Sequence, residues 1–322
     1  MSLEARERVL LVTHAADHFT VERVADGITR RGLAPVRLDT DRFPGEVQLT
    51  TRAGPGGVSA RLRWAGVDLE MATVRALWLR RVARAPRPEG LSELEAAQCV
   101  RESRAALDTV FATAPDLRWL DPLPVVRRAE NKLVQLREAA RAGLRVPQTV
   151  IGNDPDEVRA LWEACDGDVI TKMLTPVAQA MGDAPAVYTT RLTVADLADL
   201  DGLALSPMVF QERVDKSREL RVVYVAGRCF TGAREAGGDD WRRPGSGAGP
   251  WQVDSLPGEL QAQLDAVMRA LGLGFGAADF VVARDGSHHF LEVNPAGEWG
   301  MLERDLGLPI ADAIAEELCR PR

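Results

Sequence analysis

The sequence contains very little lysine. Of its 40 basic residues, only Lys132, Lys172 and Lys216 are lysines, and the others are arginines. A lysine carries a compact point charge on a flexible stem, whereas an arginine presents a planar fork of donors. In a chain that uses arginine almost everywhere, the few positions with lysine are candidates for sites that require a point charge.

Cysteine, long apolar runs and clustered positive charge are also scarce. The four cysteines are far apart and show no metal-ligand spacing, so they are expected to be core thiols of a cytoplasmic protein. No apolar run reaches the roughly 18 residues that a membrane span needs. The net charge of −7, without a basic cluster, argues against nucleic acid as a partner. The N-terminus lacks a cleavage site of small residues, so no signal peptide is expected.

The length and the order of elements predict an α/β fold with about two or three domains, because 322 residues exceed one ordinary core. An apolar strand at 9–14, a helix at 18–31 and a strand at 35–40 predict a small parallel sheet. A long helix at 92–113 follows. Together these elements are expected to form an N-terminal domain, residues 1–121.

A second region, made of two α+β domains, is expected to follow. The prolines at 121–124 break both periodicities and mark its start. A central domain is assigned to residues 122–205 and a C-terminal domain to residues 206–322. The further expected elements are helices at 131–142, 156–164, 258–271 and 309–319, and strands at 146–151, 168–173, 208–214 and 218–230.

A β-hairpin is predicted near the C-terminus. Asp285-Gly286 lies between two strand-like runs, and Asp-Gly is a leading signal for a two-residue type I′ turn. With such a turn Arg284 pairs with Ser287. The same register places Asp279 directly opposite Glu292.

This pairing predicts a magnesium site. Directly opposed like charges on paired strands are destabilising, so Asp279 and Glu292 call for a cation between them. Asn294 lies on the same strand face as Glu292 and adds a neutral oxygen. An oxygen-only site with few protein ligands suits Mg²⁺, which takes the rest of its shell from water and nucleotide phosphates. The alternative interpretation is a solvated acidic face on an edge hairpin.

Two lysines and an arginine are candidates for binding anions. Lys132 begins a helix, where free backbone N–H groups also attract anions. Lys172 ends an apolar strand, where a buried ammonium needs an anionic partner. Arg221 shares a strand face with Glu219, and the alternative interpretation of that arginine is an ion pair between these two at the surface.

A glycine-dense stretch at 237–250 contains Arg242. Long loops in compact enzymes are often lids, and an arginine there would clamp a phosphate or a substrate carboxylate. The alternative interpretation is a disordered connection.

Over residues 122–322 these motifs, in this order, resemble the ATP-grasp superfamily. The resemblance implies that Lys132 and Lys172 grip the phosphates of ATP, that Glu219 holds the ribose, and that Arg221 steadies the transferred phosphoryl group. It also implies an interdomain hinge whose backbone reads the adenine edge. The hinge residues are Gln211, Glu212, Arg213 and Val214.

Further motifs are similar to the maturases of microviridin-type peptides, the graspetides. They are the strand ending in Thr-His before RLDTDRFP, the WLRR element at 78–81, and the ENPxGxW-like ending at 292–300. The resemblance implies an ADP-forming ligase that uses ATP and Mg²⁺ on a ribosomally made precursor peptide. Asp or Glu side chains would be activated as acylphosphates and joined to Ser, Thr or Lys. The peptide's leader is expected to dock on the central domain, near residues 173–191.

Two other functions remain open on the residues alone. A generic N-terminal domain would suit a RimK-like or glutathione-synthetase-like amino-acid ligase. An ATP-binding scaffold without chemistry is the third reading. Whether the bond is an ester or an amide, and whether the chain forms a homodimer, are left open.

Overall fold

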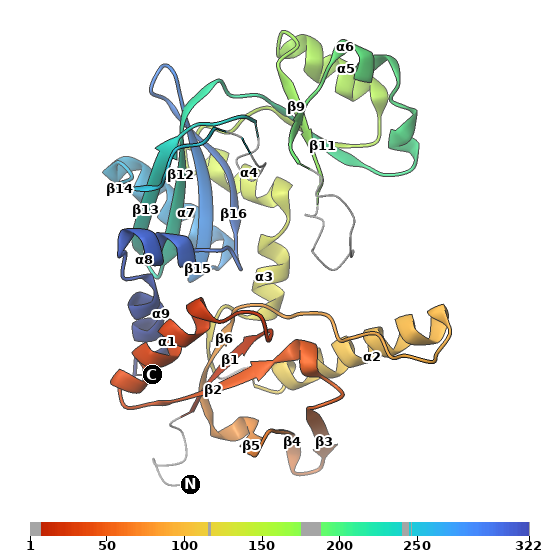
Figure 1. The fold of residues 1–322 in the computed structure, drawn as a ribbon, viewed down its shortest axis with the longest axis vertical. Helices are drawn as coiled ribbons and strands as arrows, with labels where there is room; N and C mark the ends of the chain where they lie inside the picture. Colours follow the sequence, from red (N-terminus) through yellow and green to blue (C-terminus); the bar gives the residue numbers. More distant parts are fainter. Residues whose placement is uncertain (1–7, 115–116, 175–187, 240–244, 246, 322) are drawn as a thin grey trace.

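The computed structural model describes residues 8–114, 117–174, 188–239, 245 and 247–321. Arg242 and residues 175–187 of the segment expected to dock a leader therefore lie outside the described residues. Figure 1 shows three groups of strands along the molecule, with the first domain at one end and β9 and β11 at the other. No helix among the described residues combines the length and apolar character that crossing a bilayer requires.

The predicted parallel sheet is present at the N-terminus. Strands β1 (Arg8–Thr13), β2 (Ala34–Asp39), β6 (Val74–Leu79) and β7 (Arg118–Leu120) form it in the order β2-β1-β6-β7. Helix α1 (Phe19–Arg30) buries its apolar stripe against this sheet. The carboxyl ends of β1, β2 and β6 meet at one edge, as parallel strands require.

A second, antiparallel sheet belongs to the same part of the chain. Strands β3 (Gln48–Gly54), β4 (Gly57–Trp64) and β5 (Val67–Glu70) form it. Helix α2 (Glu93–Ala112) begins at a capping box in which Ser92 accepts from the backbone of Glu95. Short 3₁₀ helices span Thr40–Arg42, Met71–Thr73 and Asp201–Ala204.

The central part carries a small antiparallel sheet in the order β10-β9-β11-β8. Its elements are α3 (Leu123–Ala129), α4 (Lys132–Arg141), β8 (Thr149–Gly152), α5 (Pro155–Ala164), β9 (Val169–Lys172), β10 (Thr190–Arg191), α6 (Val194–Ala198) and β11 (Met208–Glu212). Asn131 caps α4 by accepting from the N–H of Val134, so Lys132 is the first residue of that helix.

The C-terminal part is a five-stranded antiparallel sheet in the order β14-β13-β12-β15-β16. Its elements are β12 (Lys216–Val225), β13 (Arg228–Glu235), β14 (Gln252–Asp254), α7 (Gly258–Leu271), β15 (Phe275–Ala283), β16 (His288–Asn294), α8 (Gly300–Leu306) and α9 (Ile310–Cys319). Helix α9 returns to the first domain and packs beside α1 (Figure 1). One apolar cluster therefore joins the parallel sheet to this sheet.

The predicted two-residue turn of the hairpin is wrong. Ala283 donates its N–H to the carbonyl of Ser287, and Gly286 donates to the carbonyl of Ala283, so three residues form the turn. Gly286 has φ +84°, a value that glycine adopts without steric cost. Next to this turn Phe280 pairs with Phe290, one residue away from the predicted register.

A β-bulge then restores the predicted register. The pairing shifts between Asp279 and Phe280, so Leu291 is the extra residue and Asp279 pairs with Glu292 after all. The bulge lets Phe290 and Val293 both face the apolar core while Glu292 faces the other way. The predicted pairing of the two carboxylates is therefore confirmed, although two compensating shifts produce it.

Asp121 gives the fold a testable dependence on pH. Its buried carboxylate accepts from the N–H groups of Gly274 and Phe275, both at 2.9 Å, and so connects the segment after β7 to the start of β15. Burial raises its pKa to about 6, although these two hydrogen bonds oppose the rise. A carboxyl with a raised pKa stabilises the fold fully below its unfolded pKa, and this contribution is lost as the pH rises through the folded value.

We expect Asp121→Asn to remove that slope. Between about pH 4 and pH 7 the wild type should lose about 3 kcal/mol of unfolding free energy that the variant does not lose. Urea unfolding of both proteins across this range measures the difference. Equal slopes would contradict the assignment.

Candidate active site

Each carboxylate of the predicted metal pair has its own cation. Lys132 Nζ donates to Glu292 Oε2 at 2.5 Å. Arg221 Nη1 lies 2.7 and 2.8 Å from the two carboxylate oxygens of Asp279. The two residues are also directly opposite each other in the pairing of β12 with β15. The two carboxylates are therefore compensated without a metal, and the prediction that only a bound cation would compensate them is wrong. The opposed charges are held by cations from α4 and β12.

The charges of the site favour an ionised Glu292. Burial would raise its pKa, but the positive charges of Lys132 and Lys172 outweigh burial and lower it to about 2. Burial raises the pKa of Asp279 above its usual value, a rise that Arg221 opposes and Glu292 increases. The two carboxylates therefore differ, as coupled neighbours with like charges do.

The oxygens present fit magnesium. Asn294 lies two residues beyond Glu292 on β16, and its Oδ1 accepts from the N–H of Ala296 at 3.0 Å. Within the described ranges, no three His, Cys, Asp or Glu residues form a metal-binding group. Two carboxylates and one amide, without nitrogen or sulfur ligands, suit a hard cation that shares its shell with phosphates and water. Asp279, Glu292 and Asn294 remain the predicted ligands.

The second predicted lysine acts on the same carboxylate from the central sheet. Lys172 Nζ donates to Gln211 Oε1 at 3.1 Å, and Gln211 is buried and donates in turn to Thr149. The charge of Lys172 contributes to lowering the pKa of Glu292. The fold therefore brings Lys132 and Lys172, forty residues apart, to one point of negative charge.

The alternative ion pair of Arg221 with Glu219 is not formed. Glu219 Oε1 accepts from Lys216 at 2.5 Å, and its Oε2 accepts from Arg234 at 2.7 and 2.9 Å. Arg221 instead bonds Asp279 and the carbonyl of Glu298. The ribose contact expected of Glu219 remains a prediction.

The hinge connects the central sheet to the C-terminal sheet. Glu212 accepts from the N–H of Gln148, and Arg213 bonds Asp168 and Asp239, so the side chains of these two hinge residues are fixed. Among the residues that the structure describes, no group hydrogen-bonds to the peptide N–H or C=O of Val214. Free peptide groups at this point are what reading an adenine edge requires.

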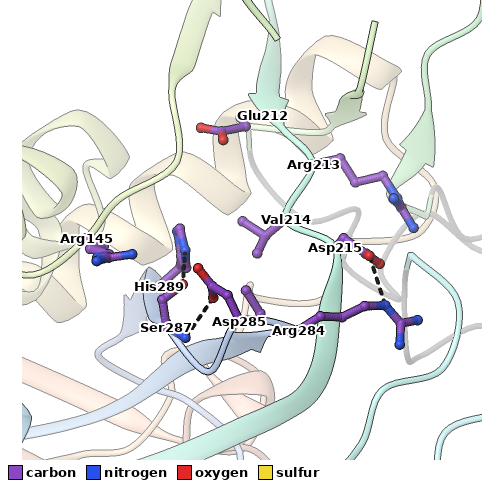
Figure 2. Close-up of a pocket in the computed structure, with 10 residues that line it drawn as sticks. Arg145, Glu212, Arg213, Val214, Asp215, Arg284, Asp285, Ser287 and His289 are labelled. Atoms are coloured by element: carbon purple, nitrogen blue, oxygen red, sulfur yellow. Dashed lines mark hydrogen bonds and ion pairs between the residues drawn. The ribbon is translucent and has the colours of Figure 1, made fainter. Parts of the chain in front are cut away.

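A pocket of about 360 Å³ adjoins the hinge. Figure 2 shows Val214 between Glu212 and Asp285, with Arg145 and His289 across the space. The residues that line it are Arg145, Glu212, Arg213, Val214, Asp215, Ala283, Arg284, Asp285, Ser287 and His289. The predicted lysines and metal ligands are not among them, so this pocket adjoins the predicted hinge and not the predicted metal ligands.

A buried cluster of charged residues lies beside Asp279 and Glu292, and it is not part of the site predicted from the sequence. Arg80 follows the apolar strand β6 and bonds the loop that contains Glu298, while Asp17 lies on its other side. Two arginines directly after a buried strand are a signal that could identify it, because a charge in that position needs buried partners.

Known proteins resemble this chain over nearly its whole length. The MvdD pre-ATP-grasp domain family matches residues 8–127. The crystal structure of macrocyclase MdnB from Microcystis aeruginosa MRC is 41% identical, covers 97% of this chain and 99% of its own, and has a TM-score of 0.85. Macrocyclase MdnC from the same organism, bound with precursor peptide MdnA, is 32% identical with the same coverage and a TM-score of 0.88.

A third structure is more distant. A Chryseobacterium gregarium RiPP-associated ATP-grasp ligase, in complex with ADP and a leader and core peptide, is 26% identical, covers 98% of each chain and has a TM-score of 0.88. No curated protein matches the chain.

We expect Asp279→Asn to abolish ATP turnover. The substitution removes one of two charged metal ligands and weakens the hold on Arg221, since an amide accepts less strongly than a carboxylate. The free energy of unfolding should fall by about 1–3 kcal/mol, because Arg221 keeps only its contact with the carbonyl of Glu298 at full strength. ADP release and denaturant unfolding measure the two effects. Normal turnover by a folded variant would remove Asp279 from the metal site.

Lys172→Arg should not restore the activity that Lys172→Met loses. Lys172 Nζ lies 3.1 Å from the buried amide oxygen of Gln211, and a larger planar guanidinium is expected to fit less well beside that amide, so charge alone should not be sufficient. Comparing the ATP turnover of the two variants separates charge from shape. Wild-type turnover in Lys172→Arg would make the position a general electrostatic one.

Proposed function

Because the chain belongs to the family of ATP-grasp peptide macrocyclases, we propose that it uses ATP and Mg²⁺ to form rings in a ribosomally made precursor peptide. Asp or Glu side chains of the peptide are activated as acylphosphates. Ser or Thr hydroxyls or Lys amines then attack them and form ω-esters or ω-amides.

The observation that carries this proposal is the paired Asp279 and Glu292 with a separate cation on each carboxylate. Lys132 would exchange Glu292 for a phosphate oxygen when the site is loaded, whereas Arg221 would stay on Asp279 and face the transferred phosphoryl group. The bound Mg²⁺ would be held by Asp279, Glu292 and Asn294 and would neutralise charge on the phosphates.

In this reaction the protein mainly positions the peptide carboxylate against ATP and neutralises the charge of the phosphates. A peptide carboxylate oxygen bonds to the γ-phosphorus of ATP while the bond to the β-phosphate oxygen breaks and ADP leaves. The attacking hydroxyl or amine then bonds to the acyl carbon, and phosphate leaves with the oxygen of the former carboxylate. Lys172 and Arg221 neutralise the oxygens of the moving phosphoryl group. Arg242 is proposed as a further phosphate or carboxylate contact.

The nucleotide is proposed to lie along the hinge. The free peptide groups of Val214 support an adenine contact there, with Gln211, Glu212 and Arg213 holding the hinge strand. The pocket beside the hinge supports the same placement of the adenine, since Val214 is among the residues that line it. Glu219 is proposed to contact the ribose.

The precursor peptide is the proposed partner. Two relatives support this proposal, because one was solved bound with precursor peptide MdnA and the other in complex with a leader and core peptide. The leader is proposed to dock on the central domain, residues 122–205, near 173–191. The N-terminal domain, residues 1–121, and the C-terminal domain, residues 206–322, would then enclose the core of the peptide.

Incubation with ATP, Mg²⁺ and a cognate precursor rich in Ser, Thr, Asp and Glu tests the proposal. The peptide should lose one water per bond formed, as seen by mass spectrometry, while ADP and phosphate accumulate in equal amounts. Turnover driven by a free amino acid, or a peptide that gains amino acids, would make the chain a RimK-like ligase. Cleavage of ATP to AMP would contradict the acylphosphate step.

A further inference from the structure

Arg80 is a charged residue in an apolar setting. It directly follows strand β6, and its side chain is 0% exposed. A guanidinium removed from water is costly unless its donors are used well. Its position at the carboxyl edge of the parallel sheet places it against the C-terminal sheet.

The donors of Arg80 hold one loop. Nη1 donates to the carbonyls of Ala296 at 2.8 Å and Gly297 at 3.0 Å, and Nη2 donates to Glu298 Oε2 at 2.6 Å. Nε lies 3.4 Å from Asp17 Oδ2. The fork of one arginine therefore reaches three consecutive residues of the loop that follows β16.

Asp17 is itself fixed in the first domain. Its carboxylate accepts from Thr13 at 2.9 Å and from Thr20 at 2.6 Å. Hydrogen bonds and the charge of Arg80 together overcome burial and lower the pKa of Asp17. Arg80 is thus anchored on the side of the first domain and reaches the loop from there.

The same loop contacts the metal pair. The carbonyl of Glu298 accepts from Arg221 Nη2 at 3.0 Å and Nε at 3.2 Å, while Nη1 of that arginine bonds Asp279. The amide oxygen of Asn294 accepts from the N–H of Ala296. Displacing the loop would therefore move the partners of two predicted metal ligands.

The loop is also packed too closely to shift freely. A Cβ added at Gly297 would lie 2.4 Å from the Cβ of Ala277 and 3.1 Å from the carbonyl of Asn294. Glu298 fixes the other end of the loop, since Oε1 accepts from the N–H groups of Trp299 and Gly300. Arg81 adds a second cation to Oε2 at 3.1 Å.

From these contacts we infer that Arg80 is a positioning residue for the metal site. It holds residues 296–298 from the first domain. The loop in turn fixes Arg221, which orients Asp279, and its Ala296 N–H fixes the amide oxygen of Asn294. Both ligands thereby keep the geometry that a divalent cation needs. The inference rests on the proposed function, because it takes these residues as the metal site. It assigns to Arg80 no contact with the substrate.

Lysine at this position cannot replace the fork, since one ammonium cannot reach two carbonyls and two carboxylates together. Arg118 offers a matched control for Arg80→Lys. It too extends from the parallel sheet to the C-terminal part, where it donates to Glu317 Oε1 at 2.9 Å and to the carbonyl of Pro321. It makes no contact with residues 296–298.

The experiment compares wild type, Arg80→Lys and Arg118→Lys as full-length proteins. Mn²⁺ serves as the probe, and the electron paramagnetic resonance signal of free Mn²⁺ measures its binding in the presence of AMPPNP. Arg80→Lys should bind Mn²⁺ about tenfold more weakly, as is typical when an outer-shell partner of a metal site is lost. Its affinity for AMPPNP without metal should stay close to wild type. Arg118→Lys should match wild type in both measurements.

Two results would overturn the inference. One is a folded Arg80→Lys protein that binds Mn²⁺ like the wild type, and the other is an equal loss in Arg118→Lys, which would indicate general domain docking. If Arg80→Lys does not fold, Asp17→Asn, which keeps the side-chain shape, should weaken Mn²⁺ binding in the same direction. Wild-type binding in that variant would also overturn it. Peptide turnover by the wild type tests the proposed function separately, because Mn²⁺ binding needs no turnover.

Discussion

The compensation of two opposed carboxylates is the constraint on which the site depends. Asp279 and Glu292 face each other on paired strands, where like charges are destabilising. Lys132 from the start of α4 and Arg221 from β12 supply the missing charge. A metal that enters this site therefore does not relieve bare repulsion. Under the proposed function the metal would exchange with Lys132, and a phosphate of ATP would accept the ammonium that is released.

The layout of the fold follows from placing these cations. Lys132 is the first residue of a helix because Asn131 caps it, and the cap fixes where the ammonium emerges. Lys172 comes from the central sheet and acts on the same Glu292. Arg221 also donates to the carbonyl of Glu298, in the loop at residues 296–298 that Arg80 hydrogen-bonds from the first domain. Three parts of the chain thus contribute to one strand pair, and the apolar cluster around α9 joins two of them, the first domain and the C-terminal sheet.

Much of this could be predicted where the pattern is local. Many strand and helix positions and the capping box of α2 follow from periodicity and capping residues, whereas the predicted pairing of Asp279 with Glu292 is correct only because a bulge offsets the wrong turn. The turn itself could not be read correctly, because Asp-Gly suits both two-residue and three-residue turns and the bulge at Leu291 is set by packing of Phe290 and Val293. The cations that pair with Asp279 and Glu292 could not be predicted from the sequence either. The arginine that pairs with Asp279 is determined by the order of strands in the sheet. In that order β12 lies between β13 and β15, which differs from the order along the chain.

The scarcity of lysine has a physical explanation in the site. Lys132 bonds Glu292, Lys172 bonds Gln211 and Lys216 bonds Glu219, so all three lysines of the chain contact residues predicted to bind metal or nucleotide. Elsewhere arginine makes the ion pairs, often with two donors on one carboxylate, and such a fork is fixed in orientation. An ammonium can change from a carboxylate to a phosphate oxygen without reorienting a plane. Sites that must exchange partners with every nucleotide therefore favour lysine, whereas Arg80, which must hold one loop in place, favours the fork.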